Sequence, residues 1–99
     1  MTFSPPNSPP ASSPATPPIV LVFSATDPTS GAGMQADILT LASMGCHPLS
    51  VITAITVQDT MGVDDVLAMD ADWIIDQARC VLEDMPVAAF KIEIGRAHV

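Results

Sequence analysis

Two continuous apolar runs, separated by an amphipathic segment, dominate the first half of the chain. Residues 19–23 and 49–57 are rich in β-branched side chains, which is typical of parallel strands covered on both faces. Residues 33–44, between them, carry apolar side chains at the spacing of one helix face. These are Met34, Ile38, Leu41 and Ala42. Gly45 suits the left-handed residue after a helix, and Pro48 prevents the helix from resuming, so the pattern predicts a strand–helix–strand unit.

The second half of the chain predicts a turn, a short strand, a second helix and a further strand. The turn covers residues 59–62, the short strand residues 63–68, and the last strand residues 87–92. Asp70 or Asp72 caps the helix between them. The apolar face of this helix consists of Ala71, Ile74, Ile75, Ala78, Val81 and Leu82.

This order of elements predicts an α/β protein with a mostly parallel sheet and helices on both faces. The chain contains three principal strands, so at least one edge of the sheet would be exposed and apolar. A complete domain of this class needs more strands. We therefore expect a chain truncated after about three principal strands.

The first eighteen residues differ in composition from the rest of the chain. They hold seven of the ten prolines and almost no bulky apolar side chains. Such a segment cannot bury enough apolar surface to offset the entropy of ordering it. We expect residues 1–18 to form a disordered tail rich in proline and serine, and residues 19–92 to form the folded part.

The charge and the cysteine pattern exclude several classes of protein. The net charge is -8 and the first cationic side chain is Arg79, so no basic cluster could neutralise nucleic-acid phosphates. No apolar run is long enough to span a bilayer, and the N-terminus lacks the features of a secretory signal. Cys46 and Cys80 form no CxxC motif and are expected as free thiols in a cytoplasmic protein. The eight acidic residues between Asp59 and Asp84 fit no metal-binding loop, so we expect a solvated surface and no metal site.

The loop between the first strand and the first helix is the first candidate for chemistry. It contains Gly31 and Gly33 after the Asp27-Pro28 pair. It is not a Walker A loop, because no Lys-Ser or Lys-Thr pair follows, and it lacks the third glycine of a dinucleotide fingerprint. Two interpretations remain open: a tight turn that needs positive φ, or a set of free N–H groups that receives a hydroxyl or phosphate oxygen.

Two polar side chains lie near the predicted ends of these elements. Asp37 stands one turn inside the first helix, where it either complements the helix dipole or accepts a hydrogen bond from a ligand hydroxyl. Gln58 follows the second strand, at the end of the sheet where α/β proteins collect ligands. Its carboxamide presents a donor beside an acceptor, which matches the edge of an aminopyrimidine.

Three segments together resemble one kinase family. They are SATDPTSGAGMQAD (residues 24–37), ASMGCHPLSVITAITVQDTMGV (residues 42–63) and VAAFKI (residues 87–92). The chain is similar, over about three quarters of its length, to the hydroxymethylpyrimidine/phosphomethylpyrimidine kinases of thiamine biosynthesis. The resemblance implies a ribokinase-like fold. It also implies ATP- and Mg²⁺-dependent phosphorylation of 4-amino-5-hydroxymethyl-2-methylpyrimidine and then of its monophosphate.

The resemblance also implies roles for particular residues. Gln58 aligns with the glutamine that contacts the pyrimidine, Asp37 with an aspartate of the same pocket, and Ala25 with a position that is often glycine. Gly31 and Gly33 then form the loop near the substrate. The ATP-binding and catalytic half of the family lies downstream, so we expect no catalytic residue here and no phosphoryl transfer by the 99 residues alone.

The resemblance leaves alternatives open. A pyridoxal kinase shares the fold, and a non-catalytic module that binds the pyrimidine without ATP is a candidate of a different class. The family implies a homodimer for the intact parent protein.

The last seven residues depart from the family pattern. After Lys91 and Ile92 the family expects a glycine, whereas this chain continues as EIGRAHV. That heptapeptide is the in-frame translation of a widely used sequencing adapter. We therefore expect residues 93–99 to be non-native, and we assign no function to Arg96 or His98.

Overall fold

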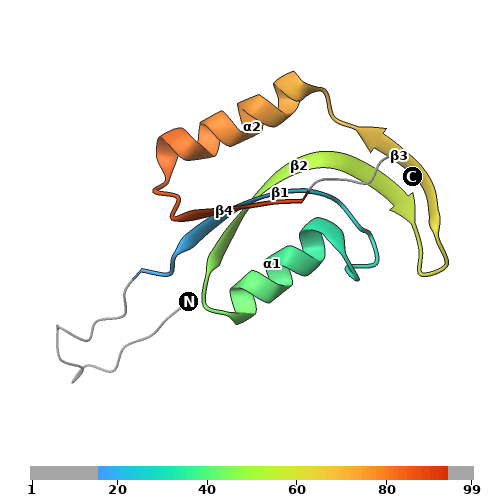
Figure 1. Cartoon of the computed structure of the whole chain (residues 1–99), viewed down its shortest axis with the longest axis horizontal. Helices are drawn as coiled ribbons and strands as arrows, with labels where there is room; N and C mark the ends of the chain where they lie inside the picture. The colour runs from blue at the N-terminus through green and yellow to red at the C-terminus, as the bar shows by residue number, and fades with distance from the viewer. Residues whose placement is uncertain (1–15, 94–99) are drawn as a thin grey trace.

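The computed structural model describes residues 16–93, which form one four-stranded sheet with a helix on each face (Figure 1). The predictions for residues 1–15 and 94–99 lie outside this range. The elements are β1 (Ile19–Ala25), α1 (Gly33–Ser43), β2 (His47–Gln58), β3 (Val63–Ala68), α2 (Ala71–Asp84) and β4 (Ala89–Ile92). The strand order is β3-β2-β1-β4.

The predicted α/β architecture is confirmed, with one antiparallel strand at the edge. β1 pairs in parallel with β2 on one side and with β4 on the other. β3 pairs antiparallel with β2, because a turn of only a few residues after Gln58 reverses the chain. The sheet is therefore mixed, and β2 and β3 form a hairpin that reaches beyond the helices (Figure 1).

Alternation along β1 divides the core between the two helices. Val20 and Val22 point to the face covered by α1, where they pack with Met34. Leu21 lies on the opposite face with Val51 and with Ala78 of α2. Successive strand residues face opposite sides of a sheet, so a strand covered by helices on both sides must be apolar throughout. This explains the uninterrupted apolar run.

The apolar face predicted for α2 is wider than the face that packs. Ile74, Ala78 and Val81 contact the sheet, whereas Ile75 and Leu82 are exposed. Each of these two residues follows a packed one and is turned about 100° from it around the helix axis, away from the sheet. The predicted apolar face thus includes Ala71, Ile75 and Leu82, which are exposed and do not belong to the face that packs on the sheet.

A glutamine of α2 continues the hydrogen bonding of β2 beyond the end of β3. The β2–β3 ladder ends at the pair Ala54 and Ala68. Two residues earlier on β2, the Ile52 N–H donates to Gln77 Oε1 at 3.0 Å, and Gln77 Nε2 donates to the Ile52 carbonyl at 2.9 Å. A side chain of α2 thus satisfies the backbone groups that β3 leaves uncovered.

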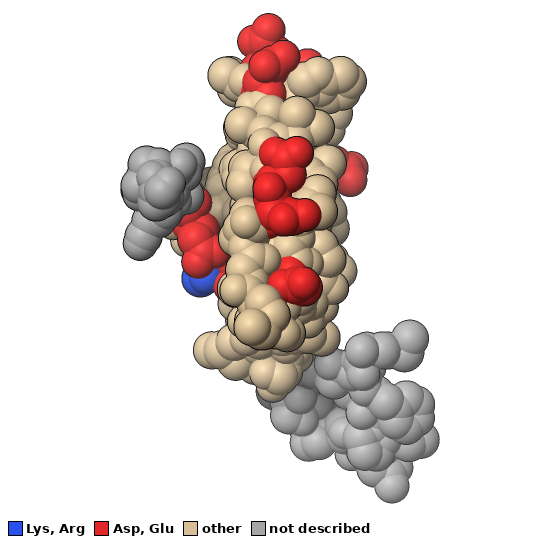
Figure 2. Space-filling model, turned by 90° about the vertical axis from the view of Figure 1, so that its right-hand side faces the viewer, with Lys and Arg blue, Asp and Glu red and all other residues tan. Residues whose placement is uncertain are grey.

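Acidic side chains lie on the surface, as the sequence predicts. The eight acidic residues between Asp59 and Asp84 are all exposed. Figure 2, which looks at the right-hand end of Figure 1, shows carboxylates spread over this face with little positive charge among them. Within residues 16–93, no helix has the length and apolar character needed to cross a membrane.

Candidate functional site

A pocket of about 500 Å³ lies where β1 and β2 end and the loop to α1 begins. The carboxyl ends of parallel strands are where open α/β sheets bind ligands. Its walls come from β1 and the loop, from β2, from β3 of the hairpin, and from the residue after β4. The lining residues are Ser24, Ala25, Thr26, Asp27, Ala32, Gly33, Thr53, Ala54, Thr56, Gln58, Val63, Val66 and Glu93.

Asp27 organises the loop between β1 and α1. Its side chain is buried, and its Oδ1 accepts hydrogen bonds from the Thr29 N–H and the Thr29 hydroxyl, both at 2.9 Å. The Asp27 N–H donates to Gln35 Oε1 at 2.7 Å, which ties the loop to the first turn of the helix. The Thr29 amide lowers the pKa of the Asp27 carboxyl below its ordinary value, against the opposing effect of burial. Asp27 therefore remains a carboxylate that holds the loop closed.

The loop satisfies three of its amides with its own oxygen atoms. The Thr29 N–H donates to Asp27 Oδ1, the Ser30 N–H to the Asp27 carbonyl, and the Gly31 N–H to Thr29 Oγ1. These three amides are already paired, so the interpretation of the loop as a set of free donors is wrong for them. The tight-turn interpretation fits the geometry better.

Positive φ falls on one of the two predicted glycines. Gly33 has φ +63°, and a Cβ there would lie 2.6 Å from the Ala25 carbonyl oxygen. The second left-handed residue of the loop is Ser30, with φ 64°, and not Gly31. Ser30 stands where the resembled family commonly has glycine, the residue that adopts this conformation without strain.

Gln58 forms one wall of the pocket and is fixed by two threonines. Its Nε2 donates to Thr56 Oγ1 at 2.6 Å, and that hydroxyl donates to the Thr26 carbonyl at 2.6 Å. The Thr56 N–H donates to Thr26 Oγ1 at 3.1 Å. Among the described residues, Gln58 Oε1 has no hydrogen-bond partner, and an amide nitrogen carries a second N–H. The carboxamide can therefore offer an acceptor and a donor to a ligand.

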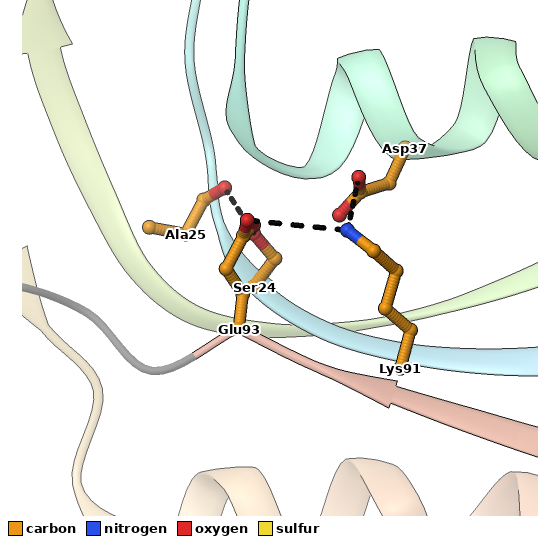
Figure 3. A network of polar contacts seen from close by, with 5 residues as sticks. All are labelled: Ser24, Ala25, Asp37, Lys91 and Glu93. Carbon is orange, nitrogen blue, oxygen red and sulfur yellow. Dashed lines mark hydrogen bonds and ion pairs between the residues drawn. The ribbon is translucent and has the colours of Figure 1, made fainter.

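Asp37 lies outside the pocket lining. Its Oδ1 pairs with Lys91 Nζ of β4 at 2.7 Å (Figure 3). The hydrogen bond with Asp37 raises the pKa of Lys91, which favours its ammonium form. Nearby, the Ser24 hydroxyl donates to Glu93 Oε1 at 2.9 Å, and Lys91 Nζ lies 3.9 Å from Glu93 Oε2.

The structure thus brings together only part of the predicted site. Ala25, Gly33 and Gln58 line one pocket, whereas Gly31 and Asp37 do not. Whether any of these residues contacts a substrate stays a prediction. The sequence analysis missed Asp27, Thr26 and Thr56. Its signal for Asp27 was the Asp-Pro pair with a threonine two residues after the Asp, a common Asx-turn pattern.

The described residues do not fit ATP or Mg²⁺. Both ionisable residues in the pocket lining, Asp27 and Glu93, are carboxylates, so the lining offers no cation for a polyphosphate. Within residues 16–93, no three His, Cys, Asp or Glu side chains meet as a set of metal ligands.

The mixed sheet, its two covering helices and the pocket at the strand ends define a ribokinase-like α/β protein. A model of the phosphomethylpyrimidine kinase family matches residues 27–95, and the chain belongs to that family. It is 40% identical over 76 residues to the hydroxymethylpyrimidine/phosphomethylpyrimidine kinase of Streptomyces coelicolor, covering 77% of this chain and 28% of the relative.

Solved structures of two kinds of vitamin kinase share the fold. The phosphomethylpyrimidine kinase of Clostridium difficile 630 superposes with a TM-score of 0.74 at 40% identity, covering 78% of this chain and 36% of that one. The pyridoxal kinase of Staphylococcus aureus in complex with pyridoxal gives a TM-score of 0.71 at 27% identity, covering 81% and 30%. The chain therefore spans about a third or less of these three relatives.

Proposed function

We propose that the chain is the N-terminal, pyrimidine-binding part of a hydroxymethylpyrimidine/phosphomethylpyrimidine kinase. The intact parent would phosphorylate 4-amino-5-hydroxymethyl-2-methylpyrimidine and its monophosphate in thiamine diphosphate biosynthesis. Family membership supports the reaction class. The observation that carries the assignment of the pocket is Gln58, held at the pocket wall with an acceptor and a second N–H to offer.

The chemistry of an aminopyrimidine edge suits this carboxamide. The exocyclic amine would donate to Gln58 Oε1, and the neighbouring ring nitrogen would accept from the second Nε2 hydrogen. The hydrogen bond to Thr56 fixes the plane of the carboxamide before the ligand arrives, which reduces the entropy lost on binding. Ala25 and Gly33 would form the neighbouring wall, with Gly31 in the loop beside it.

The parts of the reaction that the described residues do not fit are proposed for the rest of the parent protein. ATP and Mg²⁺ would bind outside residues 16–93, together with the catalytic residue, so the 99-residue chain alone would be inactive. The parent is proposed to be a cytoplasmic homodimer. Residues 93–99 are proposed to be a non-native end.

A pyridoxal kinase-like activity is the second candidate, and the likeness to the Staphylococcus aureus enzyme favours it. A parent that phosphorylates pyridoxal faster than the aminopyrimidine would replace the first proposal with this one. A non-catalytic pyrimidine-binding module would require that the gene really end after Val99.

Long-read sequencing of the source DNA across codon 92 distinguishes the N-terminal part of a longer kinase from a chain that ends after Val99. A frame that continues as Lys-Ile-Gly into a longer kinase supports the proposal. A frame that encodes EIGRAHV and then stops overturns it and favours the binding module.

The pocket assignment is tested by Gln58→Ala in the full-length parent. The variant should weaken pyrimidine binding by about 1–3 kcal/mol, seen as a raised KM, because a paired contact is removed. Val57→Ala, at the exposed neighbouring position, is the matched control and should leave the KM unchanged. Unchanged KM and kcat in Gln58→Ala would remove Gln58 from the site.

A further inference from the structure

β4 is held to the sheet by hydrogen bonds far more than by burial. Within residues 16–93 it pairs only with β1, from Ala89 opposite Val20 to Ile92 opposite Phe23. All four residues of the strand are exposed, and Phe90 and Ile92 expose 57% and 66% of their surface. Within residues 16–93, the strand has few contacts besides its ladder with β1, so a side-chain contact can add to the fixing of its carboxyl end.

The ion pair between Lys91 and Asp37 is that contact. It is the shortest ion pair among residues 16–93, at 2.7 Å, and the Asp37 side chain is only 14% exposed. The pairs of Arg79 with Asp76 and Glu83 are longer, at 3.4 and 3.6 Å, and all three of their side chains are more than half exposed. Exposed pairs of that kind contribute little to stability. The pair of Lys91 and Asp37 is shielded at the aspartate, although the Lys91 side chain is 45% exposed, and it costs more to break.

The second oxygen of Asp37 makes the dependence on Lys91 stronger. Asp37 Oδ2 is buried and has no hydrogen-bond partner among the described residues. The carboxylate is therefore compensated through one oxygen by one cation. Loss of the Lys91 ammonium would leave a shielded charge without a partner.

The pair joins two elements that both lead into the pocket. Asp37 lies on α1, one turn after the pocket residue Gly33. Lys91 lies opposite Val22 of β1, which is two residues before the pocket residue Ser24. Asp37 itself is absent from the lining. Figure 3 shows the Lys91 side chain reaching from β4 toward α1, beside Ser24.

We propose that Lys91 and Asp37 form a strut that holds the carboxyl end of β4 against α1. Asp37 then acts on the pocket as a positioning residue, through Lys91, and does not touch the ligand. The effect of Asp37 on ligand binding rests on the proposed function, whereas the existence of the strut does not.

A double-mutant cycle in the 99-residue chain tests the strut directly. Urea unfolding is measured for the unchanged chain, Asp37→Asn, Lys91→Met and the double variant. Either single change should raise the unfolding equilibrium constant about tenfold or more, and the double variant should add little to the larger single effect. In the control cycle of Arg79→Met with Asp76→Asn, the coupling should stay below about threefold. Additive effects of Asp37→Asn and Lys91→Met would overturn the strut.

Glu93 requires its own control, because it is the other carboxylate near Lys91. At 3.9 Å and 46% exposure it is a weak partner. Glu93→Gln should leave the coupling between Asp37 and Lys91 unchanged. A coupling that disappears in this background would overturn the assignment of the strut to Asp37.

A chimeric kinase, called the graft here, measures the effect of the strut on the KM for the ligand. It also allows variants to be compared that do not fold in the 99-residue chain. Residues 19–92 replace the matching segment of the Clostridium difficile phosphomethylpyrimidine kinase, whose fold they share. The strut predicts that Asp37→Asn and Lys91→Met raise the KM for the pyrimidine by similar factors, that the double variant is no worse, and that Lys91→Arg largely restores it. A large effect of Asp37→Asn with a small effect of Lys91→Met would show direct ligand contact and overturn the positioning role.

The graft also separates the two proposals. If the unmutated graft folds but does not phosphorylate the pyrimidine, the proposed function fails. The strut is then decided by the unfolding cycle, measured on the graft as well as on the short chain.

Discussion

β1 and β3 belong to the same sheet and both contain a majority of apolar residues, although β3 also carries Asp64 and Asp65, and their surroundings are opposite. Leu21 and Val22 of β1 are fully buried, with 0% exposure. All six residues of β3 are exposed, and Val63 and Leu67 show 60% and 62% of their surface. β1 has a strand on either side and a helix on each face, whereas β3 pairs, in the described part of the chain, only with β2. Burial therefore follows the place of a strand in the sheet more than its apolar content.

The pocket lies between these two regions. Ser24, Ala25 and Asp27 belong to the well-packed side, and Val63 and Val66 to the hairpin. The packed side is fixed by buried side chains and by the hydrogen bonds of Asp27. The hairpin side has few buried contacts and is held mainly by its ladder with β2. One wall of the pocket should therefore be much more resistant to local opening than the other.

The largest expected contrast is between leucines of the two strands. Leu21→Ala should lower the free energy of unfolding by about 2–5 kcal/mol, because it leaves a cavity between β1 and α2. Leu67→Ala removes an exposed side chain and should cost no more than about 0.5 kcal/mol. Urea unfolding followed by far-UV circular dichroism measures both. Equal losses would mean that the Leu67 side chain packs as closely as that of Leu21, and the comparison would fail.

A smaller contrast concerns glycines on the two sides of the pocket. Gly33→Ala should cost about 1–3 kcal/mol, because φ is positive there and the new Cβ would meet the Ala25 carbonyl. Gly62→Ala, in the hairpin turn, has nothing within 4 Å of the new Cβ and should change stability by about 0.5 kcal/mol or less. The same unfolding assay compares the two, and a neutral Gly33→Ala would show that the loop can rearrange.

The smallest expected effect is a pH dependence confined to the packed side. The pKa of Asp27 is lowered in the folded state, so its contribution to stability is present above the ordinary value of 3.8 and is lost as pH falls through the lowered one. Asp27→Asn should therefore make stability fall less steeply with acid, from roughly pH 5 downward. Thr29→Val keeps the Thr29 amide and should reduce the slope only in part. Parallel acid-unfolding curves for the unchanged chain and Asp27→Asn would contradict the role assigned to Asp27.

The sequence predicted an element of the fold well where a local pattern alone determined it. The apolar run of β1 and the helix after Gly33 come out with nearly the observed bounds, because both are set by local periodicity and by turn residues. The prediction of β2 was short by two residues at its start and one at its end. The antiparallel direction of β3 and the exposure of Ile75 and Leu82 depend on which neighbours each element finds. Periodicity does not contain that information.

The site was predicted less completely, for a related reason. The position of Gln58 follows from the rule that parallel strands collect ligands at their carboxyl ends, and it does line the pocket. Lys91, the partner of Asp37, lies 54 residues away on β4. No residue spacing in the sequence predicts a contact between the two. The left-handed residue at Ser30 was missed because glycine was taken as the marker of positive φ.

Gln77 gives the hairpin a fixed length. Two strands continue to pair wherever unbonded backbone N–H and C=O groups face each other. β2 has an N–H and a C=O available for such pairing at Ile52. After Ala68, the Met69 N–H still donates to the Thr53 carbonyl at 2.9 Å, but the Gln77 carboxamide occupies the next pair of groups at Ile52, and the chain leaves the sheet toward α2. The position of α2 therefore determines where the β2–β3 hairpin ends. Replacing Gln77 with a shorter residue would leave the Ile52 N–H and C=O groups unpaired. β2 could then pair with two more residues of its own chain or with a strand from a different molecule.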